Sequence, residues 1–161
     1  MPWWMWALLG GVALALLIAA GVWGAGLPGR LRRLFAVQRS GLQEDFFVAA
    51  ASSGKPRGLR WKAIDWKVQG VEPEPLLARE RGSGAIVALV PVTIAFEAIE
   101  GSDMEGLPAV GNLRNASAVF FWRGGRWQTI GKVVFNMNPD ETLMHFKDQY
   151  APFDSRNEST T

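Results

Sequence analysis

Residues 86–98 read IVALVPVTIAFEA, and this stretch decides the fold class. Its apolar side chains keep one parity from Ile86 to Ala98 without a break, which is the period of a β-strand. The sequence therefore predicts a long central strand. Pro91 lies in the middle of it and has no backbone N–H, which predicts a bulge or a locally unpaired amide.

A hairpin is predicted downstream of the long strand. Segments 113–123 and 126–137 flank Gly124-Gly125, and adjacent glycines suit the tight primed turn of an antiparallel pair. That register places Trp122 opposite Trp127, a pair that we interpret as sheet stabilisation, with ligand stacking as the alternative. Both faces of this hairpin are apolar, so we expect other elements or a partner to pack against each face.

The C-terminal element is predicted to be a helix. Asn138 is a favourable N-cap, Pro139 suits the first helical position, and acidic residues follow at the positive end of the helix dipole. The expected apolar stripe consists of Leu143, Phe146 and Tyr150. Residues 154–161 are polar and expected to be a disordered tail.

Upstream of the long strand, residues 77–81 and 85 onward predict a first hairpin, and VEPEPLL (71–77) predicts a loop. A strand is expected from Leu59, with a bulge where the apolar parity switches after Ala63. Before it, Ser40 and Gln43 resemble a capping box that opens a short helix.

Together these elements predict an α+β domain with a curved, mostly antiparallel sheet of about five strands and two flanking helices. The element order resembles the nuclear-transport-factor-2-like (NTF2-like) superfamily, a resemblance that implies a cone-shaped sheet around a helix.

One segment resembles a family of small membrane-anchored bacterial proteins of the kind abundant in planctomycetes. The resemblance is carried by VTIAFEAIEGSDMEGLPAVGNLRNASAVF, with KPRGLRW before it and GRWQTIGKVVFNMNP after it. It spans residues 55–146 and implies a shared domain and a bacterial origin. It implies no activity, substrate or catalytic residue.

The N-terminal segment has the composition of a membrane anchor. Residues 1–29 contain no charged side chain, and the apolar stretch 3–27 is long enough to cross a bilayer. Tryptophans flank it at both ends, as in the aromatic belts of membrane helices, and Pro28-Gly29 is expected to end the helix. A cleaved signal peptide is the alternative, but its positively charged start is missing.

The flanking charges predict the orientation. Arg30, Arg32, Arg33 and Arg39 follow the span and no Lys or Arg precedes it, so we expect the domain on the cytoplasmic side of the inner membrane. These arginines are expected to contact anionic lipid headgroups. The basic segment 30–40 is either an interfacial helix or only a topogenic flank.

This division gives an anchor (1–29), a basic linker (30–40), an α+β domain (41–153) and the tail. Residues 1–70 carry nine basic and three acidic side chains, whereas the remainder carries eight and twelve. A stripe of small residues in the anchor suggests a homodimer: Ala7, Gly11, Ala15 and Ala19.

Several site classes are excluded or disfavoured by composition. Without cysteine there is no disulfide, thiolate zinc site or cysteine nucleophile, and the single His145 excludes sites that need two imidazoles. The acidic loop Glu97–Glu105 lacks the spacing of a calcium loop, so we interpret it as an exposed acidic loop and leave open whether its negative surface binds a basic partner. We therefore predict no metal, no cofactor and no catalytic residues.

Two further patterns have structural interpretations. His145 has Glu141 and Asp148 at helical spacing, but no nucleophile motif accompanies it, and we interpret it as a solvated helix residue. The chain contains no nucleotide-binding glycine motif. Basic residues alternate with tryptophans in residues 55–67, but a strand facing the core on one side also gives this pattern, so we predict no nucleic-acid partner.

We therefore expect a single-pass membrane protein that presents a non-catalytic interaction or assembly domain at the inner membrane face. The alternative is a small-molecule-binding or enzymatic curved-sheet domain, with a cone lined by tryptophans and by Asp65 or Glu97. An open, polar-lined pocket of several hundred Å³ would favour the alternative, and a filled core the first hypothesis.

Overall fold

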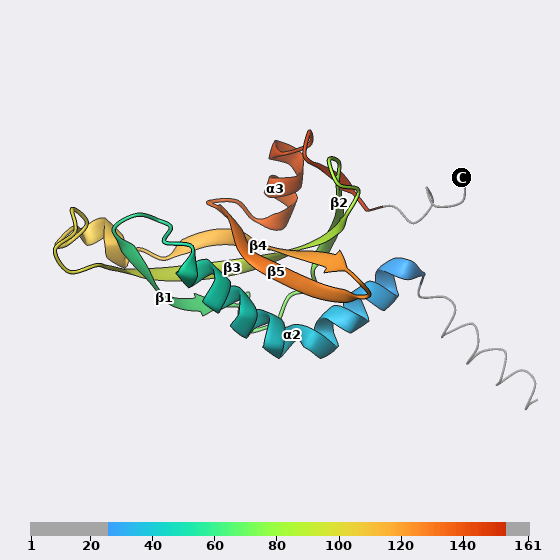
Figure 1. Cartoon of the computed structure of the whole chain (residues 1–161), viewed down its shortest axis with the longest axis horizontal. Coiled ribbons are helices and arrows are strands. Elements are labelled where there is room, and N and C mark those ends of the chain that lie inside the picture. The colour runs from blue at the N-terminus through green and yellow to red at the C-terminus, as the bar shows by residue number, and fades with distance from the viewer. Residues whose placement is uncertain (1–25, 154–161) are drawn as a thin grey trace, which may run out of the picture.

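A computed structural model describes residues 26–153. One long helix packs along one face of a six-stranded antiparallel sheet, and a short helix lies on the other face (Figure 1). The predicted α+β class is confirmed. The elements are α2 (Leu27–Ser52), β1 (Leu59–Asp65), β2 (Leu76–Glu80), β3 (Ile86–Ala98), a 3-10 turn (Pro108–Gly111), β4 (Arg114–Arg123), β5 (Arg126–Phe135), α3 (Pro139–His145) and β6 (Tyr150–Pro152).

Strand β3 is central, as predicted. The strand order is β5-β4-β3-β2-β6, and β1 pairs with the edge of β3 that β2 also uses. Strand β2 pairs with residues 86–89 and β1 with residues 93–98, so residues 90–92 have no partner strand on that edge. Pro91 lies in this gap, where its missing N–H costs the sheet nothing. The prediction of a local interruption is confirmed.

The predicted bulge in the first strand is also present. Trp61 pairs with Phe96 and Ala63 with Ala95, so Lys62 is the extra residue, just before the parity switch that indicated it. The bulge keeps Trp61 and Ile64 on the α2 side of the sheet. It lies near the middle of β1, which ends at Asp65.

The β4–β5 hairpin has the predicted turn and register. Gly124 and Gly125 both have positive φ (58° and 77°), and Trp122 pairs with Trp127 with ring centroids 5.4 Å apart. The indole Nε1 of Trp127 donates a hydrogen bond to the carbonyl of Leu31, at 3.1 Å. Trp127 is buried, so the structure supports its interpretation as a stabilising residue.

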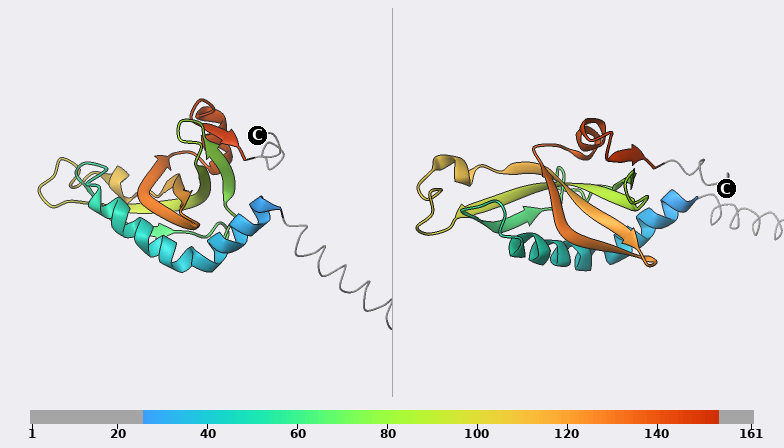
Figure 2. Two further views of the ribbon diagram at one scale, coloured as in Figure 1. Left: turned by 45° about the vertical axis from the view of Figure 1, so that its right-hand side comes forward. Right: turned by 45° about the horizontal axis from the view of Figure 1, so that its top comes forward.

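Aromatic side chains fill the space between α2 and the sheet. Phe35 of α2 packs edge-on against Phe120 and Trp127, with ring centroids 5.1 and 5.6 Å apart. Phe46, further along α2, packs against Phe120 and Trp66 in the same layer. Figure 2 shows α2 curving along the sheet, with β4 and β5 curling towards it. The concave face of the sheet is therefore filled by its own helix.

Helix α2 corrects two sequence-based expectations. Pro28 does not end a helix but lies in the first turn of α2, a position that tolerates proline because its N–H would have no partner there. Ser40 opens no second helix, because α2 continues through it. The continuous helix is favoured by Leu31 and Phe35, which are both buried in the core.

The C-terminal part differs from the prediction in length. The capping box is present. The side-chain Oδ1 of Asn138 accepts a hydrogen bond from the backbone N–H of Glu141, and the Glu141 carboxylate accepts one from the backbone N–H of Asn138. The helix, however, ends at His145. Tyr150 belongs to β6, which pairs with β2 and brings the sheet to six strands rather than about five. Its hydroxyl accepts a hydrogen bond from Lys132.

Several predictions concern residues outside 26–153. Within the described part of the chain, no helix is both long and apolar enough to cross a membrane. The predicted anchor (3–27) lies almost wholly outside the described residues, as do the small-residue stripe 7–19 and the tail 154–161.

Candidate functional site

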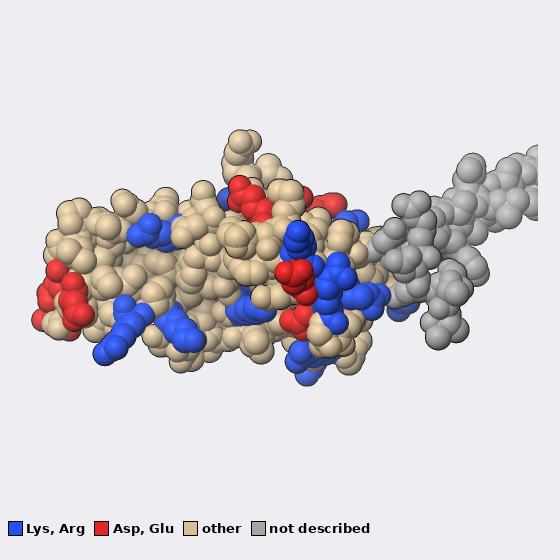
Figure 3. All heavy atoms as spheres, turned by 90° about the horizontal axis from the view of Figure 1, so that it is seen from above, with Lys and Arg blue, Asp and Glu red and all other residues tan. Residues whose placement is uncertain are grey.

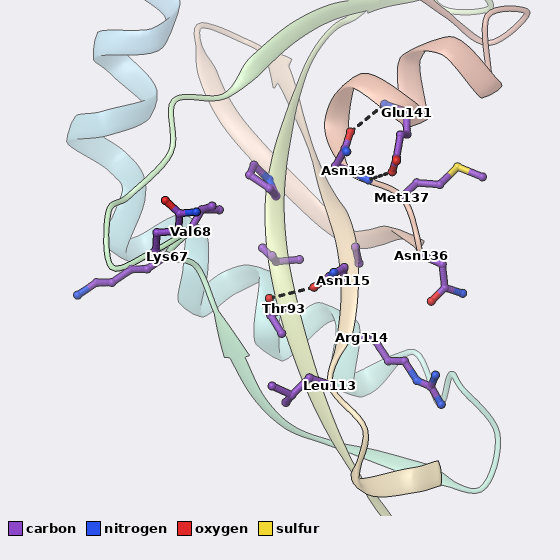
Figure 4. A pocket seen from close by; sticks show the side chains of 14 residues that line it. Lys67, Val68, Thr93, Leu113, Arg114, Asn115, Asn136, Met137, Asn138 and Glu141 are labelled. Carbon is purple, nitrogen blue, oxygen red and sulfur yellow. Dashed lines mark hydrogen bonds between the residues drawn. The ribbon is translucent and has the colours of Figure 1, made fainter.

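A hollow of about 670 Å³ opens on the face of the sheet opposite α2, beside the start of α3 (Figure 4). Its floor is formed by β3 and β4. One wall is the loop after β1, and the other is the connection from β5 to α3. The lining residues are Lys67, Val68, Gln69, Pro91, Val92, Thr93, Leu113, Arg114, Asn115, Ala116, Asn136, Met137, Asn138 and Glu141. We call this hollow the groove.

The groove arises from how the sheet is covered. Alternate side chains of β3 point away from α2, and the first two, Val87 and Leu89, are buried with Leu143 and Phe146 at the C-terminal end of α3. Thr93, further along the same face, lies beyond α3 and is only half-buried. The edge of β3 is also open here, between β2 and β1. A short helix over a long strand thus leaves a hollow.

Five of the residues that line the groove carry amide or hydroxyl groups, six are apolar, and three are charged: Lys67, Arg114 and Glu141. Thr93 Oγ1 donates a hydrogen bond to Asn115 Oδ1 at 3.4 Å, between neighbouring strands. Gln69 and Asn136 face it from the two walls, and they are the two non-glycine residues with positive φ within residues 26–153. Such conformations concentrate at binding sites, where the surrounding structure holds them in place.

These groups can bind a ligand. Amides and hydroxyls present both donors and acceptors to a neutral polar ligand. The Glu141 carboxylate is engaged by the Asn138 amide at 2.8 Å, as part of the helix cap. A smaller hollow of about 430 Å³ shares Asn136, Met137 and Glu141 with the groove and extends to His145.

The acidic loop lies at one end of the molecule, far from the groove's polar centre. Acidic side chains gather at that end in Figure 3. Glu97 pairs with Arg60 at 2.7 Å, and Glu105 accepts a hydrogen bond from the Gly101 amide. Among the described residues, no three potential ligands are placed to hold a metal ion.

His145 is exposed at the end of α3, and its ring packs edge-on against Phe146 with centroids 4.9 Å apart. Within residues 26–153 no ion pair joins it to an acid, although Asp148 follows closely in sequence. Glu141 serves the helix cap instead. The geometry is that of a surface histidine.

The basic strand and the expected cone residues are not assembled into a site either. Trp61 is buried, and Trp66 is half-buried against Phe46 of α2, so neither indole is free to stack on a base. Asp65 is exposed and caps the turn after β1 by accepting a hydrogen bond from the Lys67 amide. The predicted cone lined by tryptophans and an acid is therefore not present between α2 and the sheet.

The four arginines that follow the predicted anchor divide into two pairs. Arg39 Nη2 donates a hydrogen bond to the Pro73 carbonyl at 2.9 Å, and its Nε lies 3.5 Å from the Glu72 carboxylate. Arg32 reaches the carbonyl of Pro75 in the same loop. Arg30 and Arg33 are exposed. Arg32 and Arg39 therefore bind the β1–β2 loop to α2, whereas Arg30 and Arg33 face solvent.

Sequence reasoning missed the groove. Its residues come from four segments, and only the pairing of β3 with β4 brings Thr93 beside Asn115. The sequence nevertheless contained a signal for the groove, because Thr93 and Asn115 are polar residues in otherwise apolar strands. Comparison of the chain with protein-family models, curated proteins and solved structures gave no match.

Proposed function

We propose that the chain is a single-pass membrane protein that presents an interaction domain at the inner membrane face. The observation that carries this proposal is the junction between the uncharged segment and the fold. Residues 1–25 lead directly into α2, and Leu31 and Phe35 in the first turns of α2 are 1% and 2% exposed. An anchor formed by the uncharged segment would thus hold the domain through the first turns of a packed helix.

The charge pattern supports a cytoplasmic orientation. Arg30, Arg32, Arg33 and Arg39 follow the uncharged segment closely, and a cluster of arginines beside a membrane span favours the cytoplasmic side. Two of them, Arg30 and Arg33, are exposed on α2 and available to anionic headgroups.

An interaction role is favoured by the filled core. The concave face of the sheet is occupied by α2 and its aromatic side chains, which leaves no cavity for a substrate there. The β3–β4 loop carries three exposed acidic side chains, Glu100, Asp103 and Glu105. This loop would offer a basic protein partner a negative, accessible surface.

Two measurements test the proposal. Alkaline carbonate extraction of cell membranes should leave the full chain in the membrane fraction. A reporter that is active only outside the cytoplasm, fused after Thr161, should be inactive, and the same reporter fused ahead of Pro2 should be active. Release by carbonate, or activity of the C-terminal fusion, would contradict the proposal.

A second candidate function is supported by the groove. We propose as the alternative that a curved-sheet domain, similar in element order to the NTF2-like superfamily, binds a small neutral polar molecule at Thr93 and Asn115. A Thr93→Trp variant fills the groove, whereas Thr129→Trp changes a half-buried threonine elsewhere in the sheet. A polar compound whose NMR contacts map to the groove and vanish only in Thr93→Trp would support this function.

A further inference from the structure

We propose that the end of the domain at which α2 begins is a docking face for an anionic lipid surface, so that the domain stands end-on on the membrane. This inference rests on the proposed function and adds a surface that the sequence does not reveal. We call this surface the basic end.

The sheet topology brings several turns to the basic end. Val87 at the start of β3 pairs with Phe121 near the end of β4, so the β2–β3 turn and the β4–β5 turn lie at the same end of the sheet. Trp127 follows the second turn, and its indole donates to the carbonyl of Leu31 in the first turns of α2. The start of β6 joins them, because the amide of Arg81 donates to the carbonyl of Gln149.

Exposed cations from four chain segments meet there. Arg123 pairs with Arg126 across the β4–β5 turn, and Arg81 Nε donates to the Lys147 carbonyl at 2.8 Å. The exposed cations of the basic end are Arg30, Arg33, Arg81, Arg123, Arg126 and Lys147. In Figure 3, Lys and Arg side chains cluster towards the end at which α2 begins.

Two acidic residues lie among these cations, and the β1–β2 loop, which Arg32 and Arg39 hold against α2, adds the exposed Glu72 and Glu74. Glu80 is half-buried, and its carboxylate accepts a hydrogen bond from Ser83, while Asp148 is exposed. The exposed acids of the β3–β4 loop lie at the opposite end of the sheet. A helix of 26 residues is about 39 Å long, several times the screening length of roughly 8 Å at physiological salt. The acidic loop therefore contributes little to the potential at the basic end.

The occupant of this face is indicated by where the rest of the chain attaches. The uncharged residues 1–25 join the fold at Gly26, which lies at the basic end. If they cross a bilayer, the first surface that this end meets is the headgroup layer. Each basic side chain close to an anionic surface favours the bound state by roughly fivefold. Arg32 and Arg39 are not part of the face, because both bond to the β1–β2 loop.

The experiment compares two fluorescent probes on the full chain. The chain has no cysteine, so a single introduced thiol can be labelled selectively. Gly82 in the β2–β3 turn and Gly111 in the β3–β4 connection are both exposed, and an added Cβ meets nothing within 4 Å at either. Gly82→Cys and Gly111→Cys therefore form a matched pair at opposite ends of the sheet.

Each labelled protein is reconstituted in phosphatidylcholine vesicles with or without phosphatidylglycerol, with a quencher attached to the lipid headgroup. We expect strong quenching at position 82 only in the anionic vesicles, weaker quenching at high salt, and little quenching at position 111. The double variant R123Q/R126Q should lower the equilibrium constant for docking by roughly 25-fold and so reduce the quenching at position 82. The control R57Q/K62Q removes two exposed cations near β1 and should have no such effect.

The outcomes separate the two proposals. Equal quenching at positions 82 and 111, or unchanged quenching at position 82 in R123Q/R126Q, would overturn end-on docking even if carbonate leaves the protein in the membrane. Release by carbonate would overturn the proposed function instead. The released protein is then mixed with the same vesicles, and selective quenching at position 82 still decides whether the basic end binds anionic lipid.

Discussion

Helix α2 and strand β5 approach each other closely at Gly131, and replacement of this glycine by alanine tests how the helix packs on the sheet. A Cβ at this position would overlap the backbone nitrogen of Ala50 and would lie 2.7 Å from the carbonyl carbon of Ala49. These are backbone atoms of α2, so no side-chain rotation relieves the overlap. Helix and strand would have to move apart.

The expected cost has two parts. Gly131 has a φ of +70°, which costs an alanine about 1–2 kcal/mol. Separating a packed helix from the sheet adds about 1–3 kcal/mol, as in other overpacked cores. We therefore expect Gly131→Ala to lower the free energy of unfolding by about 2–5 kcal/mol. Gly125→Ala is the matched control, because its φ is +77° and an added Cβ meets nothing within 4 Å.

Urea unfolding of both variants, followed by tryptophan fluorescence, measures the difference. The control should lose only the backbone contribution, so Gly131→Ala should be the less stable variant by about 1–3 kcal/mol. Equal losses in the two variants would refute the argument, since they would mean that α2 does not approach β5 as closely as the structure places it.

Four further predictions use the same measurement. Trp127→Ala should cost about 3–5 kcal/mol, because it empties a buried site and removes the hydrogen bond to α2; no loss would contradict its structural role. Asn138→Ala should cost about 1 kcal/mol through the lost cap of α3, whereas Arg60→Gln should change stability by less than about 1 kcal/mol because its ion pair is exposed. A chain begun at Ser40 should be less stable by several kcal/mol than one begun at Gly26, because it lacks two buried side chains of α2; equal stability would show that the first turns are not part of the core.

Local signals in the sequence predicted the hairpins and the last cap correctly. Gly124-Gly125 requires a particular turn, and that turn determines which residues of β4 and β5 face each other. Proline likewise fits few positions in a sheet because it lacks a backbone N–H. Pro91 lies in the gap between β1 and β2, which is one such position. In each case a backbone constraint within a few residues decides the structure.

The errors occurred where distant residues decide the structure. Ser40 followed by Gln43 favours a helix start, but the core selects one continuous helix because Phe35 packs against Phe120 and Trp127. Tyr150 has helical spacing from Leu143, and only pairing with β2 makes it part of a strand. Neither partner is visible within a local window of sequence.

The polar Thr93 and Asn115 were a signal in the sequence, but the groove itself was missed for a related reason. It exists because α3 covers one part of the sheet and leaves Thr93 and Asn115 open, and this depends on the lengths of two elements rather than on a motif. The expected cone is absent between α2 and the sheet because side chains fill that space. Trp61 and Trp127, which would have lined it, are core residues beneath α2.

The charge asymmetry of the molecule follows from its topology and not from the order of charges along the chain. Counted by sequence, the excess of basic residues lies in residues 1–70, and the remainder is net acidic. Yet four of the six exposed cations of the basic end come from that net acidic part, because antiparallel strands return their turns alternately to the two ends of the sheet. The β2–β3 and β4–β5 turns therefore carry arginines to the start of α2, while the β3–β4 loop carries its acids away from it. A protein with the same residues but a different strand topology would not place its basic and acidic turns at opposite ends. The end-on orientation that we propose therefore depends on the fold itself.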